Sequence, residues 1–371
     1  MLIKLLKINI VALLFAVSSA ASATYIPQKL ATFQLDDSLS ELTIDQVIDM
    51  TFVENFGDVL NLGIKESATW LKIELPSNEG GLFLQIESPM IDSLFFYQVI
   101  DKDILYGDTT GVAFPFSTRQ IDSPQFLFEI KASEENSFAY LRIQSGKQVI
   151  VVPTINDKYE LLKAQNTSDI FFSFYAGLMM VMFLYNLFVY VSVRDQSYLY
   201  YIGYILFVAL TQLVLNGYGN QFVWPNNTWL AMRATHFSGV VSGVATIIFA
   251  GQFLHVQQNA RWLFKLMIGY TVLYIVALIT STLGYFQFSF NLINFCAMFS
   301  LILIFGSIQI YRRGFKPALY FVIAWLFFLI GVIIFVMKDY GVFPYNSLTR
   351  FALPVGSALE VVLLSLALAD R

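Results

Sequence analysis

Apolar residues fill most of the second half of the chain, where they form long runs separated by short polar joins. Each run is about 20 residues or more and holds few charges, which suits an α-helix that crosses the hydrocarbon core of a bilayer. The runs cover about residues 170–193, 198–218, 234–254, 262–283, 286–309, 317–337 and 350–369. The pattern therefore predicts an α-helical bundle with seven transmembrane spans.

The first half has a different pattern, because short apolar runs alternate there with turn residues. Trp70–Leu75 alternates apolar and polar side chains with a period of two. Further strand-length runs, rich in aromatic and β-branched residues, follow it at 82–86, 93–100, 125–130, 138–144 and 148–152. Regular spacing of this kind predicts an antiparallel β-sandwich. A short helix is expected before the strands at Thr43–Asp49, with Thr43 as its N-cap.

The first residues are typical of a secretion signal. Lys4 and Lys7 precede an apolar run at Ile8–Val17, and small residues at 21–23 form a cleavage site. The apolar run is too short for a comfortable membrane span. We therefore expect cleavage after Ala23, with an uncleaved membrane anchor as the alternative.

Charge divides the chain at the end of the predicted sandwich. From residue 24 to 168 there are 10 Lys and Arg against 21 Asp and Glu, a net charge of −11, whereas residues 169–371 hold 10 against 5, a net charge of +5. An acidic half argues against nucleic acid as a partner, because phosphates need a basic surface. Lys158–Ser168 is interpreted as a polar linker. The predicted parts are a signal peptide at 1–23, a periplasmic sandwich at 24–165 and a seven-helix domain at 166–371.

Basic residues predict the orientation of the bundle, because the cytoplasmic joins of membrane proteins are enriched in Lys and Arg. One set of joins carries Arg194, Arg261, Lys265, Arg312, Arg313, Lys316 and Arg371. The other set carries only Arg233, Lys338 and Arg350. We therefore expect the first set to be cytoplasmic, which puts the sandwich in the periplasm, as the secretion signal requires independently. The predicted location is the inner membrane of a bacterium, with a cytoplasmic C-terminus.

An ordered set of short segments resembles one family of bacterial receptors. The segments are 68–78 (ATWLKIELPSN), 88–97, 108–119 and 140–145 in the first half, and 219–226 and 354–371 in the second half. The first four are similar to the second type of extracellular domain of 7TM-DISM receptors, which are seven-transmembrane receptors with diverse intracellular signalling modules. The last two are similar to the membrane domain of that family. The resemblance covers nearly the whole mature chain.

The resemblance implies a jelly-roll-like sandwich that binds a ligand, with carbohydrate as one ligand class. It also implies a bundle that passes the signal to a cytoplasmic output module, often a diguanylate cyclase or a histidine kinase. In the family the last helix continues into that module, so we expect the output to lie beyond Arg371 or in a separate partner. The chain contains no His-Glu-x-x-His motif, P-loop or dinucleotide fingerprint. We therefore predict no enzymatic activity, metal or cofactor for it.

Aromatic and arginine side chains are the candidate ligand contacts in the sandwich, because aromatic faces stack on ligands and arginine grips carboxylates. The candidates are Trp70, Tyr97, Arg119, Tyr140 and Arg142. A structural role is the alternative for each of them. Trp70 lies in the middle of an alternating strand and suits the core, and Arg119 lies in a turn-rich stretch.

Glu360 is the candidate switch in the membrane, because an ionisable group near the middle of a span is costly and usually faces the bundle interior. Two interpretations stay open. Glu360 either makes a contact that differs between signalling states, or it packs as a hydrogen-bonded residue with Asn186, Asn291 or Asn294.

Three functions follow from these features. The preferred one is a sensor whose last helix shifts when a periplasmic small molecule, carbohydrate or protein binds. A small-solute transporter and a scaffold that recruits a separate signalling partner are the alternatives. A retinal protein is disfavoured because the last span has no lysine for a Schiff base. Gly239 and Gly243 form a small-residue pair that suits either internal helix packing or a homodimer.

Overall fold

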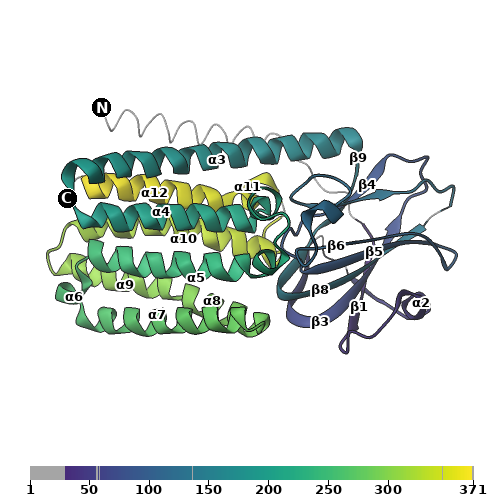
Figure 1. The fold of residues 1–371 in the computed structure, drawn as a ribbon, viewed down its shortest axis with the longest axis horizontal. Helices are drawn as coiled ribbons and strands as arrows, with labels where there is room; N and C mark the ends of the chain where they lie inside the picture. Colours follow the sequence, from purple (N-terminus) through teal and green to yellow (C-terminus); the bar gives the residue numbers. More distant parts are fainter. Residues whose placement is uncertain (1–29, 56, 58, 136, 345, 370–371) are drawn as a thin grey trace.

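The computed structural model describes residues 30–369 except 56, 58, 136 and 345. The predicted signal peptide lies outside the described residues. A β domain and a bundle of long helices lie end to end along the longest axis of the molecule (Figure 1). This arrangement confirms the predicted fold class, a β-sandwich followed by a helical membrane domain.

Two antiparallel sheets form the β domain. Its strands are β1 (Thr32–Asp37), β2 (Val53–Asn55), β3 (Leu60–Leu75), β4 (Leu82–Ile86), β5 (Ser93–Ile100), β6 (Asp103–Thr110), β7 (Phe126–Ile130), β8 (Ser137–Val151) and β9 (Pro153–Asp157). The large sheet has the order β2-β1-β3-β8-β5-β6, and the small sheet has the order β7-β4-β9. Two short helices accompany them, α2 (Ile44–Val47) and η1 (Phe116–Thr118).

The core of the β domain lies between the two sheets. Leu71 and Ile73 on β3 face it together with Leu84 on β4, and all three are fully buried. Phe96 of the large sheet stacks on Phe128 of the small sheet, with 4.6 Å between the ring centroids. The period-two alternation in the sequence thus sends one face of each strand into a shared apolar layer.

Two of the predicted strands are a single bent strand. The runs at 138–144 and 148–152 both belong to β8, and Ser145-Gly146-Lys147 between them continues the strand instead of ending it. The partner strand β3 also changes register at this point, opposite Ser145. The glycine and serine were typical of a turn, but here they mark a bend of the kind that β-bulges produce.

The helices of the bundle give seven candidate membrane spans. They are α3 (Lys158–Val193), α4 (Gln196–Leu215), α5 (Thr228–Phe253), α7 (Arg261–Thr282), α8 (Phe286–Ala297) with α9 (Phe299–Arg312), α10 (Pro317–Asp339) and α12 (Ala352–Ala369). Shorter turns lie at η2 (Gly219–Val223), α6 (Val256–Asn259) and α11 (Ser347–Arg350). Each of the seven predicted runs therefore lies in long apolar helix, and α8 and α9 share the fifth.

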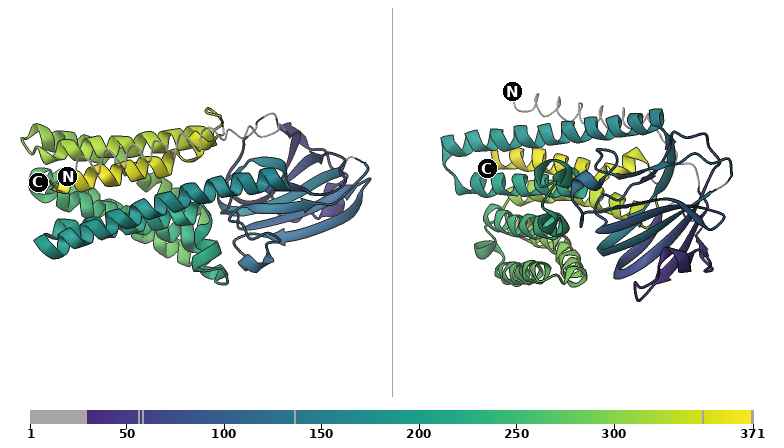
Figure 2. Two further views of the ribbon diagram at one scale, coloured as in Figure 1. Left: turned by 90° about the horizontal axis from the view of Figure 1, so that it is seen from above. Right: turned by 45° about the vertical axis from the view of Figure 1, so that its right-hand side comes forward.

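The predicted linker at Lys158–Ser168 is wrong, because these residues form the first turns of α3. The Asp157 side chain caps the helix by accepting a hydrogen bond from the Glu160 backbone at 2.8 Å. A helix of 36 residues is about 54 Å long, whereas the hydrocarbon core is about 30 Å thick. The first turns of α3 therefore stand beside the β domain (Figures 1 and 2). Polarity suggested a loop, although Lys, Glu, Leu and Ala are strong helix formers.

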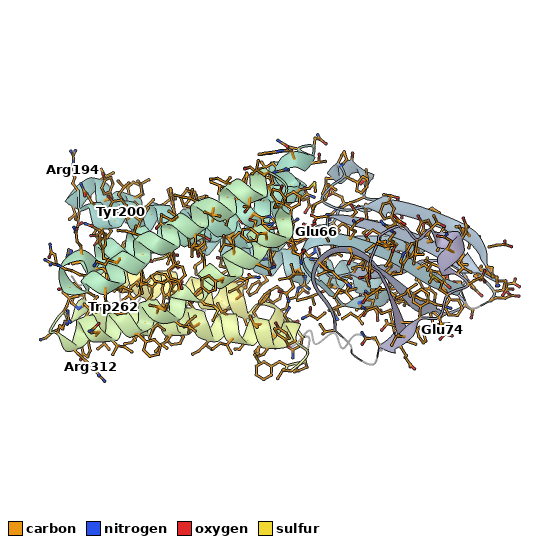
Figure 3. The ribbon with its side chains drawn as sticks, turned by 90° about the horizontal axis from the view of Figure 1, so that it is seen from below. Glu66, Glu74, Arg194, Tyr200, Trp262 and Arg312 are labelled. Carbon is orange, nitrogen blue, oxygen red and sulfur yellow. The ribbon has the colours of Figure 1, made fainter. Side chains whose placement is uncertain are left out.

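The basic residues lie at two ends of the bundle, as their spacing predicted. Arg194 and Arg312 lie at the end farthest from the β domain, where Tyr200 and Trp262 also lie (Figure 3). Arg350 lies at the opposite end and pairs with Glu87 of the β domain. We call the end that contacts the β domain the docked end and the other the far end.

Candidate functional site

Four of the predicted ligand contacts share one face of the large sheet. Trp70 on β3 lies opposite Arg142 on β8, and Tyr140 on β8 lies opposite Tyr97 on β5. The rings of Trp70 and Tyr97 stack, with centroids 6.2 Å apart. This face points away from the other sheet, because the neighbouring residue Leu71 enters the core between the sheets.

The N-terminal segment covers this face. Ile44 and Val47 of α2 pack against Trp70 and Tyr140, whose side chains are only 1% and 2% exposed. Neither ring is therefore presented to a ligand, and the structure favours a core role for both. The aromatic character of the strands gave no sign of this cover, because α2 comes from a segment outside them.

The two arginines have structural partners. Arg142 donates hydrogen bonds to the Ser40 carbonyl at 2.9 Å and to Gln144 Oε1 at 3.3 Å, which ties down the N-terminal segment. Arg119 lies apart from the other four candidates, in the loop that follows η1. Its guanidinium donates to the carbonyls of Ser123 and Pro124 at 2.7 and 2.8 Å.

Arg119 is held inside its loop by aromatic rings. Its guanidinium lies 4.6 Å from the Phe116 ring and 4.4 Å from the Phe126 ring. Burial lowers the pKa of Arg119 to about 9, so the side chain stays cationic at neutral pH. Arg119 therefore holds a loop of the β domain in place and is not a free side chain that could bind an anion.

Glu360 lies on α12 in the interior of the bundle and is fully buried. The Tyr204 hydroxyl on α4 donates a hydrogen bond to Glu360 Oε1 at 2.6 Å, and Oε2 has no partner among the described residues. Two further tyrosines of α4 hold the same helix. Tyr201 donates to the Val361 carbonyl, and Tyr198 donates to the Leu368 carbonyl at 3.1 Å.

Helix α3 contacts α12 through two more polar pairs. The hydroxyls of Tyr175 and Ser357 share a hydrogen bond of 3.1 Å. Asn186 Oδ1 accepts a hydrogen bond of 3.1 Å from the Ser365 hydroxyl. Asn186 therefore belongs to the α12 network, but its partner is Ser365 and not the predicted Glu360.

Asn291 and Asn294 do not join this network. Both are exposed on α8, which packs mainly against α5 and α7, whereas α12 packs against α10, α3 and α4. The expected pairing of these two asparagines with Glu360 is therefore corrected. Hydropathy placed them in the membrane, but a sequence does not tell which neighbour a helix face meets.

Glycines set the spacing of three helix pairs, α10 with α12, α5 with α7, and α5 with α8. A Cβ atom on Gly331 of α10 would lie 2.6 Å from the Ala352 carbonyl oxygen, so α10 and α12 approach more closely than larger residues allow. A Cβ on Gly243 would lie 2.2 Å from the Tyr274 ring, and one on Gly239 would lie 3.2 Å from Ile293. The Gly239–Gly243 face is therefore filled inside one chain, which favours internal packing over a homodimer.

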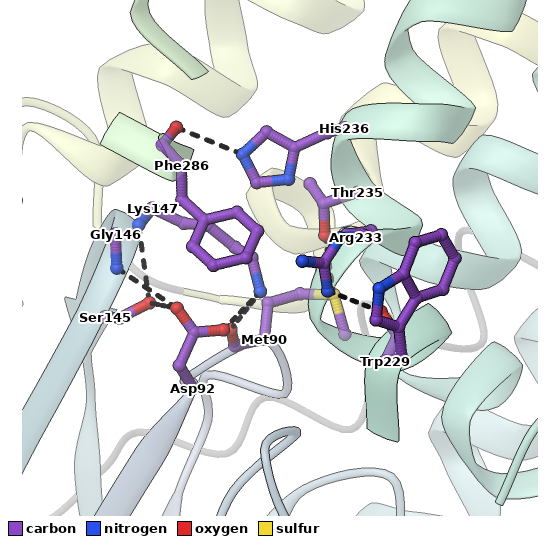
Figure 4. Close-up of polar contacts among 10 residues, drawn as sticks. All are labelled: Met90, Asp92, Ser145, Gly146, Lys147, Trp229, Arg233, Thr235, His236 and Phe286. Carbon is purple, nitrogen blue, oxygen red and sulfur yellow. Dashed lines mark hydrogen bonds and ion pairs between the residues drawn. The ribbon is translucent and has the colours of Figure 1, made fainter. Parts of the chain in front are cut away.

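The β domain meets the bundle at a contact surface that we call the joint, formed by the loops and strand bends of the β domain and the docked ends of α3, α4, α5, α8 and α11. A buried ion pair lies at its centre, where Lys147 Nζ is 2.5 Å from Asp92 Oδ1 (Figure 4). Asp92 Oδ2 also accepts hydrogen bonds from the Ser145 hydroxyl and the Gly146 backbone, at 3.0 and 3.1 Å. The bend in β8 is thereby fixed by one carboxylate.

Helix α8 begins against this bend. A Cβ on Gly146 would lie 2.7 Å from Phe286 Cβ, so only glycine fits without movement. The Phe286 carbonyl lies 3.2 Å from His236 Nε2 of α5 (Figure 4). The next residue, Gln287, donates from its side chain to the Ile64 carbonyl on β3 at 3.0 Å. Both β3 and β8 therefore contact the start of α8 at their bends.

Two loops of the β domain contact the turn after α4. The Phe116 backbone donates to the Pro225 carbonyl at 2.8 Å. Gln221 Nε2 donates to Asp122 Oδ1 at 2.9 Å. Gly217 has a positive φ of 85°, and a Cβ there would lie 2.7 Å from Pro89 Cβ. This glycine thus gives both the turn and the close approach of the two domains.

The joint also reaches the start of α12. Arg350 of α11 pairs with Glu87, which directly follows β4, at 3.5 Å. The adjacent Phe351 stacks on Phe171 of α3, with 3.9 Å between ring centroids. Among the described residues, His, Cys, Asp and Glu form no group of three that could hold a metal ion. The joint is thus a contact between the two domains made by an ion pair, hydrogen bonds and stacked rings.

Comparison with protein families matches both parts of the chain. Residues 168–371 match the model described as 7TM diverse intracellular signalling, and residues 31–156 match the model described as 7TMR-DISM extracellular 2. The first match covers more than half of the chain. No match was found among curated protein sequences.

Replacement of Trp70 by alanine tests its role as a core residue. We expect Trp70→Ala to lower the free energy of unfolding of the β domain by about 3–5 kcal/mol, because a large buried side chain leaves a cavity. Tyr97→Ala, at a half-buried position on the same face, should lower it less. Pulse proteolysis in urea on the full chain measures both. Unchanged protease resistance in Trp70→Ala would contradict the core role.

Replacement of Lys147 by methionine tests the buried ion pair. The variant leaves the Asp92 carboxylate buried without its cation, which should lower stability by roughly 3–5 kcal/mol. Adding Asp92→Asn should restore most of the loss, as thermal unfolding of the full chain would show. Lys102→Met is the control, since Lys102 pairs with Asp49 on the surface and should have no measurable effect. Equal losses in the single and double variants would argue against the pair.

Proposed function

Because the chain belongs to the 7TMR-DISM family of membrane receptors with an extracellular sensor domain, we propose that it reports the state of that domain by moving α12. The family is linked to intracellular signalling. In this proposal the β domain is the sensor, the joint is the coupling element, and the far end of α12 is the output. The observation that carries it is the connection of one small sheet to two helices.

The small sheet is attached to both α3 and α12. Its strand β9 runs into α3 after Asp157 without a loop, so the sheet and helix move together. Its strand β4 is followed by Glu87, which pairs with Arg350 just before α12 begins. The stacked rings of Phe171 and Phe351 join the two helices at the same level. A displacement of this sheet would therefore be felt by both helices.

The hydrogen bonds that α3 and α4 make with α12 suit a helix that can occupy two positions. Its partners on α3 and α4 are hydrogen-bonding groups, which are directional, so a shift along the axis breaks them together. Glu360 Oε2 has no partner among the residues described here, which leaves one acceptor for a second arrangement. Interfaces of this kind tend to switch between discrete states rather than deform continuously. These features support the switch interpretation of Glu360.

The finer parts of the proposal follow the sequence. We place the receptor in a bacterial inner membrane with the far end of the bundle in the cytoplasm, supported by its basic residues. The output module is a diguanylate cyclase or a histidine kinase, which receives the movement of α12. The chain described here contributes sensing and relay, and that module contributes the catalysis. The ligand is a periplasmic small molecule, carbohydrate or protein.

Distance measurements between spin labels test the relay. Labels on Val193 and Ala369, at the far ends of α3 and α12, are introduced into a Cys296→Ala background in lipid nanodiscs. We expect Arg350→Ala to change the distance distribution between the labels, because it removes the ion pair that joins α12 to the small sheet. Lys102→Ala, which breaks a surface ion pair in the β domain, is the control. Identical distributions in Arg350→Ala and the unaltered protein would refute the relay.

Removal of the Tyr204 hydroxyl tests the switch. In Tyr204→Phe the Glu360 carboxyl group loses its donor, which should destabilise the present position of α12 by about 1 kcal/mol. The same pair of labels should then report a larger share of a second distance. Tyr200→Phe, an exposed ring on the same helix, is the matched control. If Tyr204→Phe and Tyr200→Phe behave alike, Glu360 is a packing residue only.

A further inference from the structure

A cavity of about 360 Å³ lies inside the joint. The loop before β7 forms one wall, and the docked end of α3, the turn after α4 and α11 form the others. The volume falls within the range of about 300–1,000 Å³ that small-molecule sites occupy. The cavity is separate from the sheet face of Trp70 and Tyr140, neither of which lines it.

Three amide side chains that line this cavity each have one polar atom without a partner among the described residues. Gln125 Oε1, Gln165 Nε2 and Gln221 Oε1 are buried, and none has a hydrogen bond to the residues that the structure describes. Gln125 is only 9% exposed. The three residues come from three separate elements: the loop before β7, helix α3 and turn η2. Buried polar groups are nearly always paired, so this convergence points to a partner from outside the chain.

The charged groups on the walls, in contrast, are already engaged. Asp122 accepts a hydrogen bond from Gln221 Nε2 at 2.9 Å, and Asp169 accepts one from the Tyr218 hydroxyl at 2.6 Å. Arg350 pairs with Glu87 outside the cavity. What is left for a ligand is therefore uncharged, because the unpaired atoms belong to amides, which offer donors and acceptors without charge.

Aromatic rings form the apolar side of the cavity. Phe172 stacks on Tyr218, with ring centroids 4.3 Å apart and planes 18° apart. Phe222 also stacks with Tyr218, with ring centroids 6.3 Å apart. A flat or cyclic molecule would thus meet amides on one edge and an apolar wall on another.

We propose that this cavity binds a small uncharged solute that carries hydroxyl or amide groups on one edge and an apolar face on another. Both domains contribute walls, so the solute binds differently when the joint opens or closes and thereby biases the joint. The occupancy of the cavity is independent of the relay, but its meaning as a signal rests on the proposed function.

Binding is tested on the full chain in lipid nanodiscs, with uncharged probes and with charged derivatives of one of them. D-glucose, N-acetyl-D-glucosamine and a diketopiperazine are the neutral probes, and D-glucosamine and D-glucuronate carry a charge on the same sugar ring. We expect at least one neutral probe to raise the midpoint of thermal unfolding and to bind in calorimetry. The charged probes should bind about tenfold more weakly or worse, because the charged groups of the walls already have hydrogen-bond or ion-pair partners and would not fully offset the desolvation of the probe's charge.

Gln125→Leu separates the site from general stability. The variant removes an unpartnered buried amide, so the protein without probe should unfold at the same or a higher temperature. Binding of the neutral probe should fall about tenfold or more. Gln257→Leu, the same substitution on an exposed residue of α6 at the far end, is the control and should leave binding unchanged.

Three outcomes would overturn the inference. Neutral probes that fail to bind would mean that the cavity holds water only. Binding that persists in Gln125→Leu would place the site elsewhere, and stronger binding of a charged probe would contradict its chemistry. The spin-label distances keep the two proposals apart. Binding without a change at α12 leaves the cavity and removes the relay, whereas an Arg350→Ala response without any binding leaves the relay and removes the cavity.

Discussion

Asp92 and Lys147 form an ion pair inside the β domain, where their side chains are only 9% and 2% exposed, and the shape of the β-domain surface that meets α8 depends on how that pair is accommodated. Burying two charges is unfavourable unless every remaining polar atom is satisfied. The Ser145 hydroxyl and the Gly146 amide supply those contacts, and both can do so only because β8 bends between them. The same bend brings the bare backbone of Gly146 against Phe286. A buried pair of this kind adds little net stability, but it holds β8 in the bent form that brings Gly146 against Phe286, since an unbent strand would leave the Asp92 carboxylate without these donors. The contact with α8 therefore depends on an ion pair inside the β domain and on the close approach that glycine allows.

The geometry of the joint matters because α3 and α12, the two helices that leave it, are long and stiff. Helix α3 begins within the β domain and crosses the whole bundle, so it converts a small rotation of the small sheet into a displacement at the far end. Helix α12 is connected to the same sheet through Arg350, and Gly331 and Gly356 bring the backbones of α10 and α12 close together. The polar contacts of α12 face α3 and α4, so relative motion of α3 and α12 acts on the hydrogen bonds of the core. The connection between the two domains thus depends on where α3 and α12 begin, because both start at the joint.

Hydropathy and period-two alternation were sufficient for the seven spans and for most strands of the sandwich, since both patterns are local. They failed where a local sequence pattern was compatible with two different structures. Lys158–Ser168 was polar enough for a linker, but its helix formers and the Asp157 cap extend α3. Ser145-Gly146-Lys147 had the composition of a turn, but it is a bend within β8. The candidate site was harder still. Trp70 and Tyr140 were correctly placed on strands, yet the pairing of these strands and the cover by α2 depend on tertiary packing. Gln125, Gln165 and Gln221 looked like ordinary polar residues, because only the fold brings them to one cavity.

The energies involved are of a size that one ligand can control. Five hydrogen bonds hold α12 to α3 and α4, made by Tyr175, Tyr198, Tyr201, Tyr204 and Asn186. Interhelical hydrogen bonds in membranes are worth about 0.6 kcal/mol each, so the set amounts to about 3 kcal/mol. A solute that binds with micromolar affinity releases about 8 kcal/mol, and reversing a population from 1:99 to 99:1 needs about 5.5 kcal/mol of difference between two states. A ligand that contacts both domains at the joint therefore needs to place only part of its binding energy in that difference. A much stronger hold on α12 would lock the bundle, and a purely apolar one would give the helix no defined second position.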